Sequence, residues 1–267
     1  MNGGLIILTP LDLALASLLV VAVAALSLRM KLGVERQLLV AGVRTTLQLL
    51  LIGLVLKAVF ERADLVWVGA IAVFMLLVAG REVVARQRYR LVGWWGFGIG
   101  SFAMLVSSFA VTLLALHVMV QVQPWYAPQY SIPLLGMLLG NTMNGIALGL
   151  DRLTETSWQQ RTAIEARLML GQDWNQAIAD IRRQSARSGL IPIINAMAAA
   201  GVVSLPGMMT GQILAGAPPV EAVKYQILIM FLIAGGTGFG TLAAVYAASR
   251  RLFDERQRLR LDRIKKG

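Results

Sequence analysis

The sequence predicts an all-α, polytopic membrane protein with about seven transmembrane helices. Of its 267 residues, 57% are hydrophobic and 15% are charged, which is too apolar for a single water-soluble domain of this length. The apolar residues lie in continuous runs, and most runs have the roughly 17 to 25 residues that a helix needs to cross a bilayer. Residues 1–267 are therefore predicted to form one transmembrane domain.

Seven apolar runs follow one another along the chain. The third is short for a span, and the fourth is long enough to tilt or to extend beyond the membrane surface. No basic residue precedes the first run, so we predict a retained span and not a signal peptide. The runs lie near residues 10–28, 38–60, 65–80, 91–118, 131–150, 189–215 and 222–248.

The positions of the basic residues predict the orientation, because Lys and Arg in short loops stay on the cytoplasmic side. Arg44 lies within the second run and is assigned to neither side of the membrane. The side opposite the cytoplasm then holds only Lys57, Arg62 and Lys224. The N-terminus is therefore predicted outside, and the basic tail 250–267 in the cytoplasm. Each basic cluster flanks a span, where anionic lipid accounts for the charge of +11, so no nucleic-acid partner is expected. Four segments hold 21 of the 25 basic residues: 29–36, 81–90, 152–187 and 250–266.

Residues 151–188, between the fifth and sixth runs, are predicted to form a cytoplasmic helix-turn-helix loop. Residues 161–170 favour a helix, and Gly171 suits the position that follows a helix C-cap. Asp173 and Gln176 have the spacing of a capping box, which predicts that a second helix begins there.

The second helix of this loop has an apolar stripe formed by Trp174, Ala177, Ile178 and Ile181, which recur at three- and four-residue spacing. Two interpretations remain open for what covers this stripe. The loop could pack on its own membrane domain or on lipid headgroups, or it could dock into a groove on a soluble partner.

Residues 204–212 interrupt the sixth run with proline and glycine, which break a spanning helix and free backbone groups that lipid cannot satisfy. One interpretation is a proline-kinked helix closed by packing against its neighbours. The other is a discontinuous or re-entrant helix that lines a pathway, with freed carbonyls and Met thioethers facing a solute. The candidate pathway residues here are Pro206, Gly207, Met208 and Met209.

The fifth run places Met137, Gly140, Asn141 and Asn144 on one helical face. The two Asn side chains are costly against lipid, so they are expected to face the interior of the bundle and a translocation pathway. The alternative is a close helix contact at Gly136 and Gly140, with the Asn side chains joining the helices. Both can hold together.

A polar pair in the second run, two glycines in the seventh run and a single histidine could each have a functional or a structural role. Arg44 and Gln48 in the second run are candidates for a gate or a substrate contact, although Arg44 can reach the interface by snorkelling. Gly236 and Gly240 fit a small-x-x-x-small helix contact. The only histidine, His117, has no neighbouring carboxylate or cysteine in sequence and is expected to be an interfacial imidazole.

Several of these motifs together resemble the FetB-type permease family, and the resemblance runs over nearly the whole chain. Bacterial members are iron-export ABC permeases, and plant relatives confer aluminium tolerance. The residues that carry the resemblance are Gly136-Met137 with Gly140-Asn141, Leu170-Gly171, Leu190-Ile191-Pro192, the segment 201–209, Ala215-Gly216, and Pro219, Ala222, Lys224, Tyr225 and Gln226.

The resemblance implies a non-catalytic permease subunit, acting as a homodimer with a separate ABC ATP-binding subunit in the bacterial inner (plasma) membrane. ATP and Mg would bind the partner, and this chain would carry no cofactor. The sequence agrees, because it contains no Gly-x-x-x-x-Gly-Lys-Ser/Thr phosphate loop. The loop 151–188 then becomes the element that couples to the partner.

Part of this loop also has the spacing of the Glu-Ala-Ala signature of ABC importer permeases, although Arg167 stands where that signature has its second Ala. The signature positions are Glu165, Ala166, Gly171 and Ile181. The full set of predicted coupling residues is Glu165, Ala166, Gly171, Asp173, Trp174, Ile178 and Ile181.

The cargo and the class of transporter have alternatives. An ion-coupled secondary transporter would usually carry intramembrane carboxylates, and only Asp12 lies near a span, at its edge. An intramembrane hydrolase would have only Ser and His117 as a catalytic pair. Iron is implied by the resemblance alone. No cluster of carboxylates within the predicted spans offers the oxygen ligands that iron prefers, whereas Met and Asn side chains could contact a soft metal or a chelate. A non-metal substrate therefore stays open, and no metal ligand is assigned.

Overall fold

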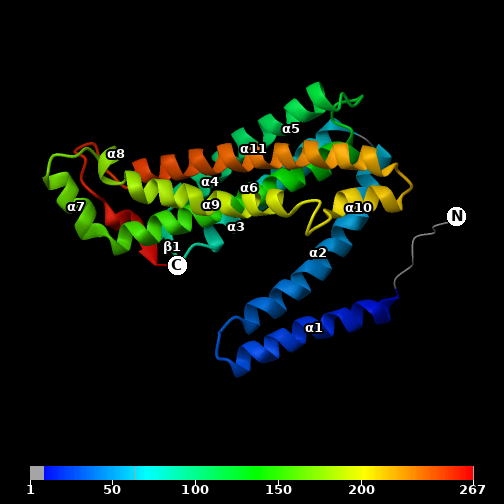
Figure 1. Ribbon diagram of the computed structural model, residues 1–267, viewed down its shortest axis with the longest axis horizontal. Coiled ribbons are helices and arrows are strands. Elements are labelled where there is room, and N and C mark those ends of the chain that lie inside the picture. The colour runs from blue at the N-terminus through cyan, green and yellow to red at the C-terminus, as the bar shows by residue number, and fades with distance from the viewer. Residues whose placement is uncertain (1–8, 63, 267) are drawn as a thin grey trace. The chain divides into compact units, whose positions relative to one another are not determined.

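A computed structural model describes residues 9–62 and 64–266 of the chain. The described chain separates into two compact units, Met1–Asp64 and Leu65–Gly267 (Figure 1). The predicted all-α polytopic fold is confirmed, because six helices among the described residues are long and apolar enough to cross a membrane. The number of crossings and their orientation stay predictions.

The first unit is a hairpin of two helices. Helix α1 (Pro10–Arg29) begins with a capping box, in which the Thr9 hydroxyl accepts from the Asp12 amide and the Asp12 carboxylate accepts from the Thr9 amide. The chain then reverses at Gly33, where φ is +72°. Helix α2 (Glu35–Arg62) runs back along α1.

The second unit begins with α3 (Leu65–Ala85), which leads through the short strand β1 (Tyr89–Leu91) into the fourth predicted span. That span is one helical rod over Trp95–Met119. It is built from α4 (Trp95–Met104) and α5 (Ala110–Leu114), with the π-helical turns η1 (Leu105–Phe109) and η2 (Ala115–Met119) following each of them. The strand explains why this span begins later than the apolar run predicted from residue 91.

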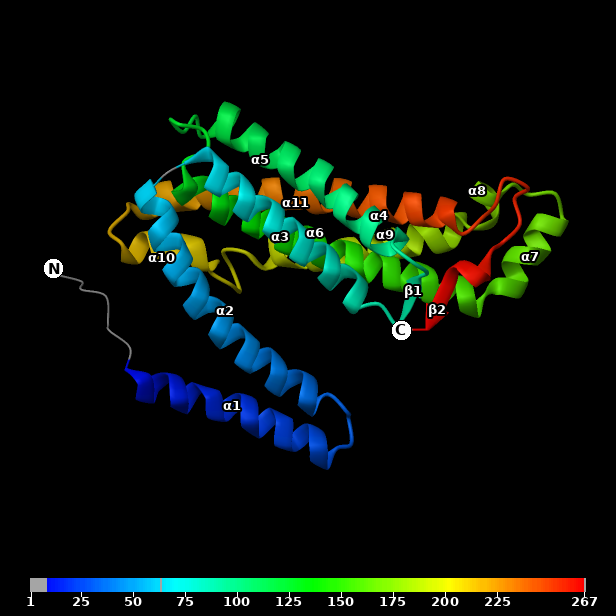
Figure 2. The ribbon, with the colours of Figure 1, turned by 180° about the vertical axis from the view of Figure 1, so that it is seen from behind.

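Helix α6 (Pro128–Gln159) is the centre of the second unit and packs against α3, α9 (Ala179–Ala199) and α11 (Pro219–Arg251). It has 32 residues, so at 1.5 Å per residue it is about 48 Å long and exceeds the hydrocarbon thickness of about 30 Å. The first residues of the predicted loop 151–188 are therefore a continuation of α6. Figure 2 shows α3 and the α4–α5 rod alongside α6 and α11.

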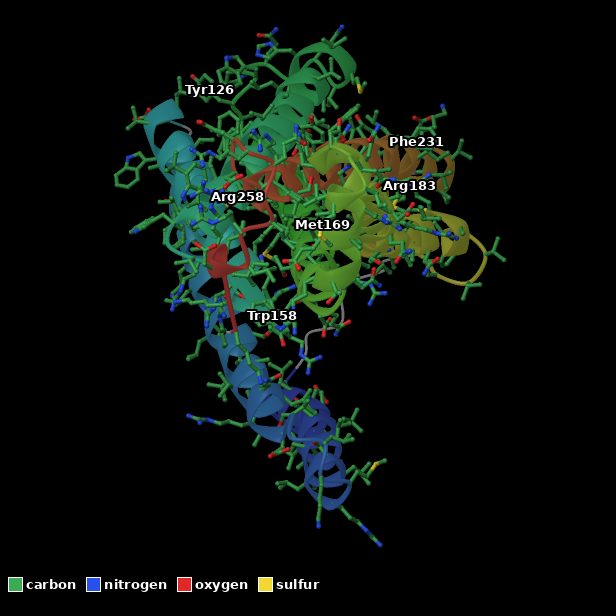
Figure 3. All side chains as sticks on the ribbon, turned by 90° about the vertical axis from the view of Figure 1, so that its left-hand side faces the viewer. Tyr126, Trp158, Met169, Arg183, Phe231 and Arg258 are labelled. Carbon is green, nitrogen blue, oxygen red and sulfur yellow. The ribbon has the colours of Figure 1, made fainter. Side chains whose placement is uncertain are left out.

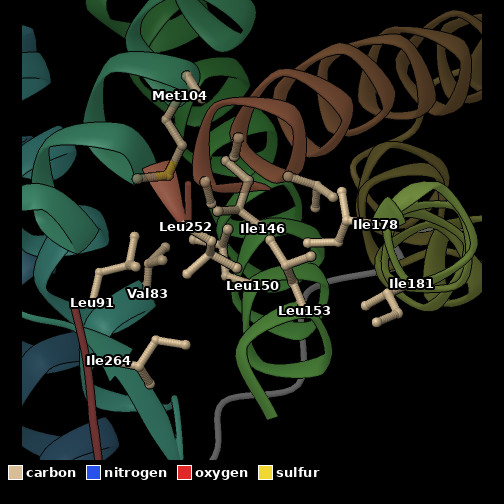
Figure 4. Close-up of a cluster of buried hydrophobic side chains, with 14 of the residues drawn as sticks. Val83, Leu91, Met104, Ile146, Leu150, Leu153, Ile178, Ile181, Leu252 and Ile264 are labelled. Atoms are coloured by element: carbon tan, nitrogen blue, oxygen red, sulfur yellow. The ribbon is translucent and has the colours of Figure 1, made fainter. Parts of the chain in front are cut away.

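Two hydrophobic clusters hold the second unit together. The larger joins α3, α6, α9 and α11 with the chain's C-terminal segment, and Figure 4 shows its centre. Its side chains from distant parts of the sequence include Val83, Leu150, Ile178, Leu252 and Ile264, each at most 5% exposed. Because the cluster includes Leu252 and Ile264, the segment predicted to be a basic cytoplasmic tail is folded onto the unit over its described residues, 250–266.

The tail contains structure that the sequence interpretation missed. After the short helix η3 (Leu261–Arg263), the strand β2 (Ile264–Lys266) pairs antiparallel with β1, with Arg90 opposite Lys265. This two-stranded sheet is a small addition to an otherwise helical fold. A strand of three residues gives no usable alternation, and its partner lies far away in the sequence.

The sixth predicted span, 189–215, is not one helix. Helix α9 ends at Ala199, and a separate short helix, α10 (Gly207–Leu214), follows after a non-helical stretch. Both helices pack against α11. The span is interrupted as predicted, but the break lies at residues 200–206 and not at 204–212, because residues 207–212 belong to α10. The interpretation as one kinked helix is wrong.

Candidate functional site

Basic segments predicted to share one side of the membrane lie together at one end of the second unit. β1 and β2 pair there, and the Thr154 hydroxyl on α6 donates to the Tyr89 carbonyl at 2.6 Å. The Trp158 ring stacks on Tyr89 with centroids 5.8 Å apart. Figures 1 and 2 show α7 (Arg161–Met169), α8 (Trp174–Ala177) and β1 at this end. We call it the basic end, formed by residues 86–94, 151–188 and 250–266.

The turn between α7 and α8 has the predicted local structure. Gly171 has φ of +89°, a conformation that favours glycine, and its amide donates to the Leu168 carbonyl at 3.0 Å. The Asp173 carboxylate accepts from the Gln176 amide at 2.7 Å, and the Gln176 side chain accepts from the Asp173 amide at 3.3 Å. The C′ glycine and the capping box are both confirmed, and together they hold the turn in one conformation.

The apolar stripe of the loop is covered by the chain itself. Ala177 and Ile178 are fully buried and Ile181 is 4% exposed, and all three lie in the cluster with Leu150 and Leu252. The prediction that Ile178 and Ile181 meet a partner directly is therefore wrong, because neither has surface to offer. The interpretation in which the loop packs on its own membrane domain holds for this stripe.

Trp174 is also part of the internal packing. Its ring lies 6.0 Å from the Tyr246 ring and 6.1 Å from the Phe253 ring, and the Arg250 guanidinium lies 5.2 Å from its centroid. The Trp174 amide donates to the Gln257 side chain at 2.8 Å. Trp174 therefore connects the loop to α11 and to the C-terminal segment.

The exposed tip of the loop is apolar, and sequence reasoning missed it. Met169 and Leu170 are 82% and 84% exposed at the end of α7. The predicted residues Glu165, Gly171 and Asp173 are exposed beside them, while Ala166 is half-buried. Figure 3 looks onto this end and labels Met169 and Arg258.

A hollow of about 430 Å³ lies beside this tip, and residues from the tip and from the C-terminal segment line it. We call Met169, Leu170 and this hollow the tip surface. Met169 and Leu170 form an exposed apolar pair beside the charged side chains of Asp173, Arg256 and Arg258. The hollow is lined by Leu168, Met169, Gly171, Gln172, Asp173, Arg256, Gln257 and Arg258.

An ion-pair network fixes α7 to the start of α9. Arg167 lies 3.2 Å from the Asp180 carboxylate and also donates to the Ala177 carbonyl at 3.2 Å. Arg183 donates to the same carboxylate. The hydrogen bonds from Arg183 and Arg167 lower the pKa of Asp180. The tip is thereby connected to a helix that enters the membrane domain.

The predicted polar face of α6 is open in the single chain. Asn144 is exposed, and Met137, Gly140 and Asn141 are half-buried. The Asn141 amide donates to the Met137 carbonyl of its own helix at 2.8 Å. The prediction that both Asn side chains face the interior of this chain's bundle is therefore wrong for Asn144. We call Met137, Gly140, Asn141 and Asn144 the open face of α6.

Arg86 lies where the open face approaches the basic end. Its guanidinium donates to the Asn144 side chain and lies 3.9 Å from the Glu82 carboxylate. Arg86 thus places a positive charge beside Asn144. No local sequence motif could have joined these two residues, which are 58 positions apart.

The buried faces of α6, α9 and α11 meet at small residues. A Cβ on Gly189 would lie 2.4 Å from the Gly145 carbonyl oxygen, and one on Gly240 would lie 2.5 Å from Thr142 Cγ2. A Cβ on Gly236 would lie 3.0 Å from Leu138. The predicted helix contact at Gly236 and Gly240 is confirmed. At Gly140 no atom lies within 4 Å of an added Cβ, so the predicted close contact there is wrong.

The break between α9 and α10 is an ordered turn that satisfies much of its own backbone. Gly201 has φ of +82°, its amide donates to the Ser204 carbonyl at 2.9 Å, and the Val203 amide donates to the Ala199 carbonyl at 3.0 Å. From Arg187 to Ala199 is 12 residues, about 18 Å of helix. If Arg187 lies at the membrane surface, as the predicted sixth span implies, the break would lie about halfway across a core of about 30 Å.

The side chains predicted to line a pathway at this break differ in exposure. Met208 is 38% exposed, and Met209 is 7% exposed. Pro206 caps α10 and its carbonyl accepts from the Thr210 amide at 3.1 Å, while Gly207 is the first residue of α10. Met209 therefore offers little to a solute, whereas the large side chains of Val202 and Val203 are 89% and 84% exposed.

The remaining candidate residues lie in the first unit. Arg44 and Gln48 are one turn apart on α2, and they line a shallow groove of about 510 Å³ with Leu39, Val43 and Leu47. Within residues 9–62 and 64–266, no group of three His, Asp or Glu side chains could hold a metal ion. The described side chains therefore do not form a cluster of the oxygen ligands that hard metals prefer.

Comparison with known proteins gives consistent matches. The sequence profile described as "Uncharacterised protein family (UPF0014)" matches residues 10–253. The chain is 43% identical over 234 residues to a UPF0014 membrane protein of Synechocystis, covering 85% of this chain and 87% of that protein. No solved structure matches.

Two further relatives have names that describe a process. The probable iron export permease protein FetB of Escherichia coli is 32% identical over 255 residues, or 96% of each chain. Protein ALUMINUM SENSITIVE 3 of Arabidopsis thaliana is 31% identical over 232 residues, which are 86% of this chain and 83% of that protein.

Proposed function

The chain belongs to the UPF0014 family, and on that premise we propose that it is the membrane-spanning permease subunit of an ATP-driven exporter. The name of the Escherichia coli relative supports iron or another metal as the cargo. The subunit is non-catalytic, because ATP and Mg would bind a separate ABC subunit. The multi-pass helical fold supports this role.

The observation that carries the proposal is the tip surface at the basic end. Met169 and Leu170 are more than four-fifths exposed, yet the turn that bears them is fixed by Gly171 and the capping box. A rigid apolar projection suits insertion into a groove of a soluble partner. We therefore assign the docking contact to the tip surface, with Glu165, Gly171 and Asp173 around it.

The buried members of the predicted coupling set would transmit the movement. Displacement of the tip would reach α9 through the contact between Arg167 and Asp180, and through Ile178 and Ile181 in the core. Trp174 would carry it to α11 through Tyr246 and Phe253. These are positioning residues, since their side chains contact this chain and not the partner.

Two copies of the chain would form the pathway between them. The open face of α6 carries polar groups at membrane depth, where exposure to lipid is unfavourable. A second copy facing it would enclose Met137, Asn141 and Asn144, which could contact a soft metal or a chelate. The contact between Arg86 and Asn144 would then lie at the inner end of this pathway.

The experiment is copurification of the chain with an ABC ATP-binding subunit, followed by ATP-dependent iron movement in vesicles. Leu170→Asp should abolish copurification and transport while the protein still inserts and folds. The matched control is Val220→Asp, which changes another apolar side chain, 67% exposed, at the start of α11. Equal copurification of Leu170→Asp and the unsubstituted chain would contradict the docking assignment. Uphill flux by the purified chain with an ion gradient and no ATP would instead establish a secondary transporter.

A further inference from the structure

A long apolar groove runs between the α4–η1 rod and α11 and opens at the basic end. It encloses about 1240 Å³. Phe102, Val106 and Phe239 line its inner part, and Trp94 and Trp95 line its mouth. Trp94 is 83% exposed, and tryptophan at the end of a span is typical of the membrane–water interface.

The length of the groove matches one leaflet of a bilayer. Its lining on α11 extends from Phe239 to Arg251, which is about 18 Å at 1.5 Å per residue. Half of a hydrocarbon core of about 30 Å is about 15 Å. The groove therefore extends from the interface to about the middle of the membrane, which is the depth that an acyl chain occupies.

A second hollow of about 780 Å³ continues the groove at the basic end. The two share Trp95, Ile99, Ala247, Arg251 and Arg263 as lining residues. The second hollow is polar and has an excess of positive charge, with five arginines against two carboxylates. These residues are Arg250, Arg251, Arg256, Arg258 and Arg263, with Asp254 and Glu255.

Arg251 lies at the junction of the two hollows. Its guanidinium lies 4.1 Å from the centroid of the Trp95 ring. Its Nε is buried and has no hydrogen-bond partner within the described chain. Among the described residues, no carboxylate lies within ion-pair distance of Arg251, and Asp262 at the rim is paired with Arg260 at 2.8 Å.

Arg263 adds a second positive charge at the same junction. It donates to the carbonyls of Arg251 at 2.8 Å and Phe253 at 3.2 Å, and both of these acceptors are neutral. Of the two carboxylates in the second hollow, Asp254 is paired with Arg258 at 2.8 Å. The junction therefore has net positive charge next to an apolar channel.

We propose that the groove and the second hollow together bind one membrane phospholipid with an anionic headgroup. An acyl chain lies in the groove between Phe102 and Phe239, and the headgroup phosphate contacts Arg251 and the neighbouring arginines. A soluble anion would leave the apolar groove unfilled, whereas a phospholipid satisfies both halves of the site. The site shares Arg256 and Arg258 with the hollow of the tip surface, whereas Met169, Leu170 and the open face of α6 lie outside it.

The test uses the full-length chain and measures bound lipid by native mass spectrometry after exchange into equal amounts of phosphatidylglycerol and phosphatidylcholine. Phosphatidylglycerol should be retained preferentially. Arg251→Gln and Arg256→Gln should each lower that preference by about fivefold, the effect of removing one cation near an anionic headgroup. Arg152→Gln is the control, because it removes an exposed arginine outside both hollows.

A second variant tests the groove itself. An added Cβ at Gly98 meets no atom within 4 Å, and Gly98 lines the groove, so Gly98→Leu should fill the groove without disturbing the helix and should reduce retention of the lipid. Gly69→Leu on α3 is the control, because it also has open space around its Cβ. Thermal unfolding checks that each variant is folded.

Three outcomes would overturn the proposal. Equal retention of both lipids, unaffected by the Arg251 and Gly98 substitutions, would show that lipid binds adventitiously and not at this site. A change of oligomeric state in Gly98→Leu would assign the groove to a contact between copies. Displacement of bound phosphatidylglycerol by inorganic phosphate alone would show a free-anion site. None of these readouts involves the ATP-binding subunit, so they leave the transport proposal unaffected.

Discussion

Single glycines set how closely α6 and α9 approach each other. A side chain on Gly189 would collide with the Gly145 carbonyl, which is backbone and cannot rotate away. Gly189→Ala should therefore lower the stability of the folded protein by about 1 to 3 kcal/mol, as overpacking of a core does. Thermal unfolding in detergent measures this loss. Gly69→Ala on α3 is the control and should be neutral, because its added Cβ meets no atom within 4 Å. Equal melting temperatures for the two variants would contradict this assignment.

The carboxylate of Asp180 gives the tip surface a pH dependence. The hydrogen bond from Arg183 lowers the pKa of this carboxylate most, and the hydrogen bond from Arg167 has the next largest effect. A lowered pKa in the folded state means that the stabilisation is present above the ordinary value and is lost as the pH falls through the folded pKa. The protection factors of the amides of residues 170–173, which correct for the intrinsic pH dependence of hydrogen exchange, should then fall at acid pH. In Asp180→Asn these protection factors should be low already at neutral pH, and a variant with the pH profile of the unsubstituted protein would contradict the prediction.

At the scale of whole elements, the C-terminal segment is a structural part of the basic end. Ile264 on β2 is 5% exposed and lies in the large cluster near Leu91 and Val83. Ile264→Ala should lower the free energy of unfolding by about 2 to 5 kcal/mol, since it leaves a cavity. Limited proteolysis should show earlier cleavage after residue 250. Lys265→Ala, at an exposed position of the same strand, should behave like the unsubstituted protein.

The sequence predicted those elements whose cause is local. The capping box at Asp173 and the glycine after α7 depend on neighbours within a few residues, and both are confirmed. The break after Ala199 follows from proline and glycine in the segment itself. The strands β1 and β2 are separated by most of the chain, and no local sequence pattern predicts that they pair.

The candidate site shows the same division between local and distant causes. The apolar stripe of Trp174, Ile178 and Ile181 was recognisable from its spacing, but the surface that covers it was not. The pattern of a helix facing its own core is the same as that of a helix facing a partner. The tip residues Met169 and Leu170 were missed because exposure is a property of the folded chain.

For the assembly as a whole, the open face of α6 predicts a contact between two copies. The chain has no cysteine, so single cysteines can be introduced without background. Asn141→Cys should form a disulfide-linked dimer on mild oxidation, because two copies that enclose one pathway bring this face together. Phe231→Cys on α11 is the control, at a side chain that is 66% exposed. Equal crosslinking of both variants would mean random collision and would remove the evidence for this interface.

The break between α9 and α10 decides how a solute could cross the whole molecule. The predicted sixth span would place it about halfway through a core of about 30 Å, and Val202 within it is 89% exposed in the single chain. Irregular backbone at this depth is stable only where protein or water surrounds it. If the break lines a pathway, Val202→Cys should react with a small water-soluble thiol reagent in the assembled protein. Leu242→Cys is the control: Leu242 lies nine residues before Arg251 on α11, about 14 Å from the basic end, and is 50% exposed. On a surface that faces lipid it should not react. If Val202→Cys is as unreactive as Leu242→Cys, the break is closed by packing and does not line the pathway.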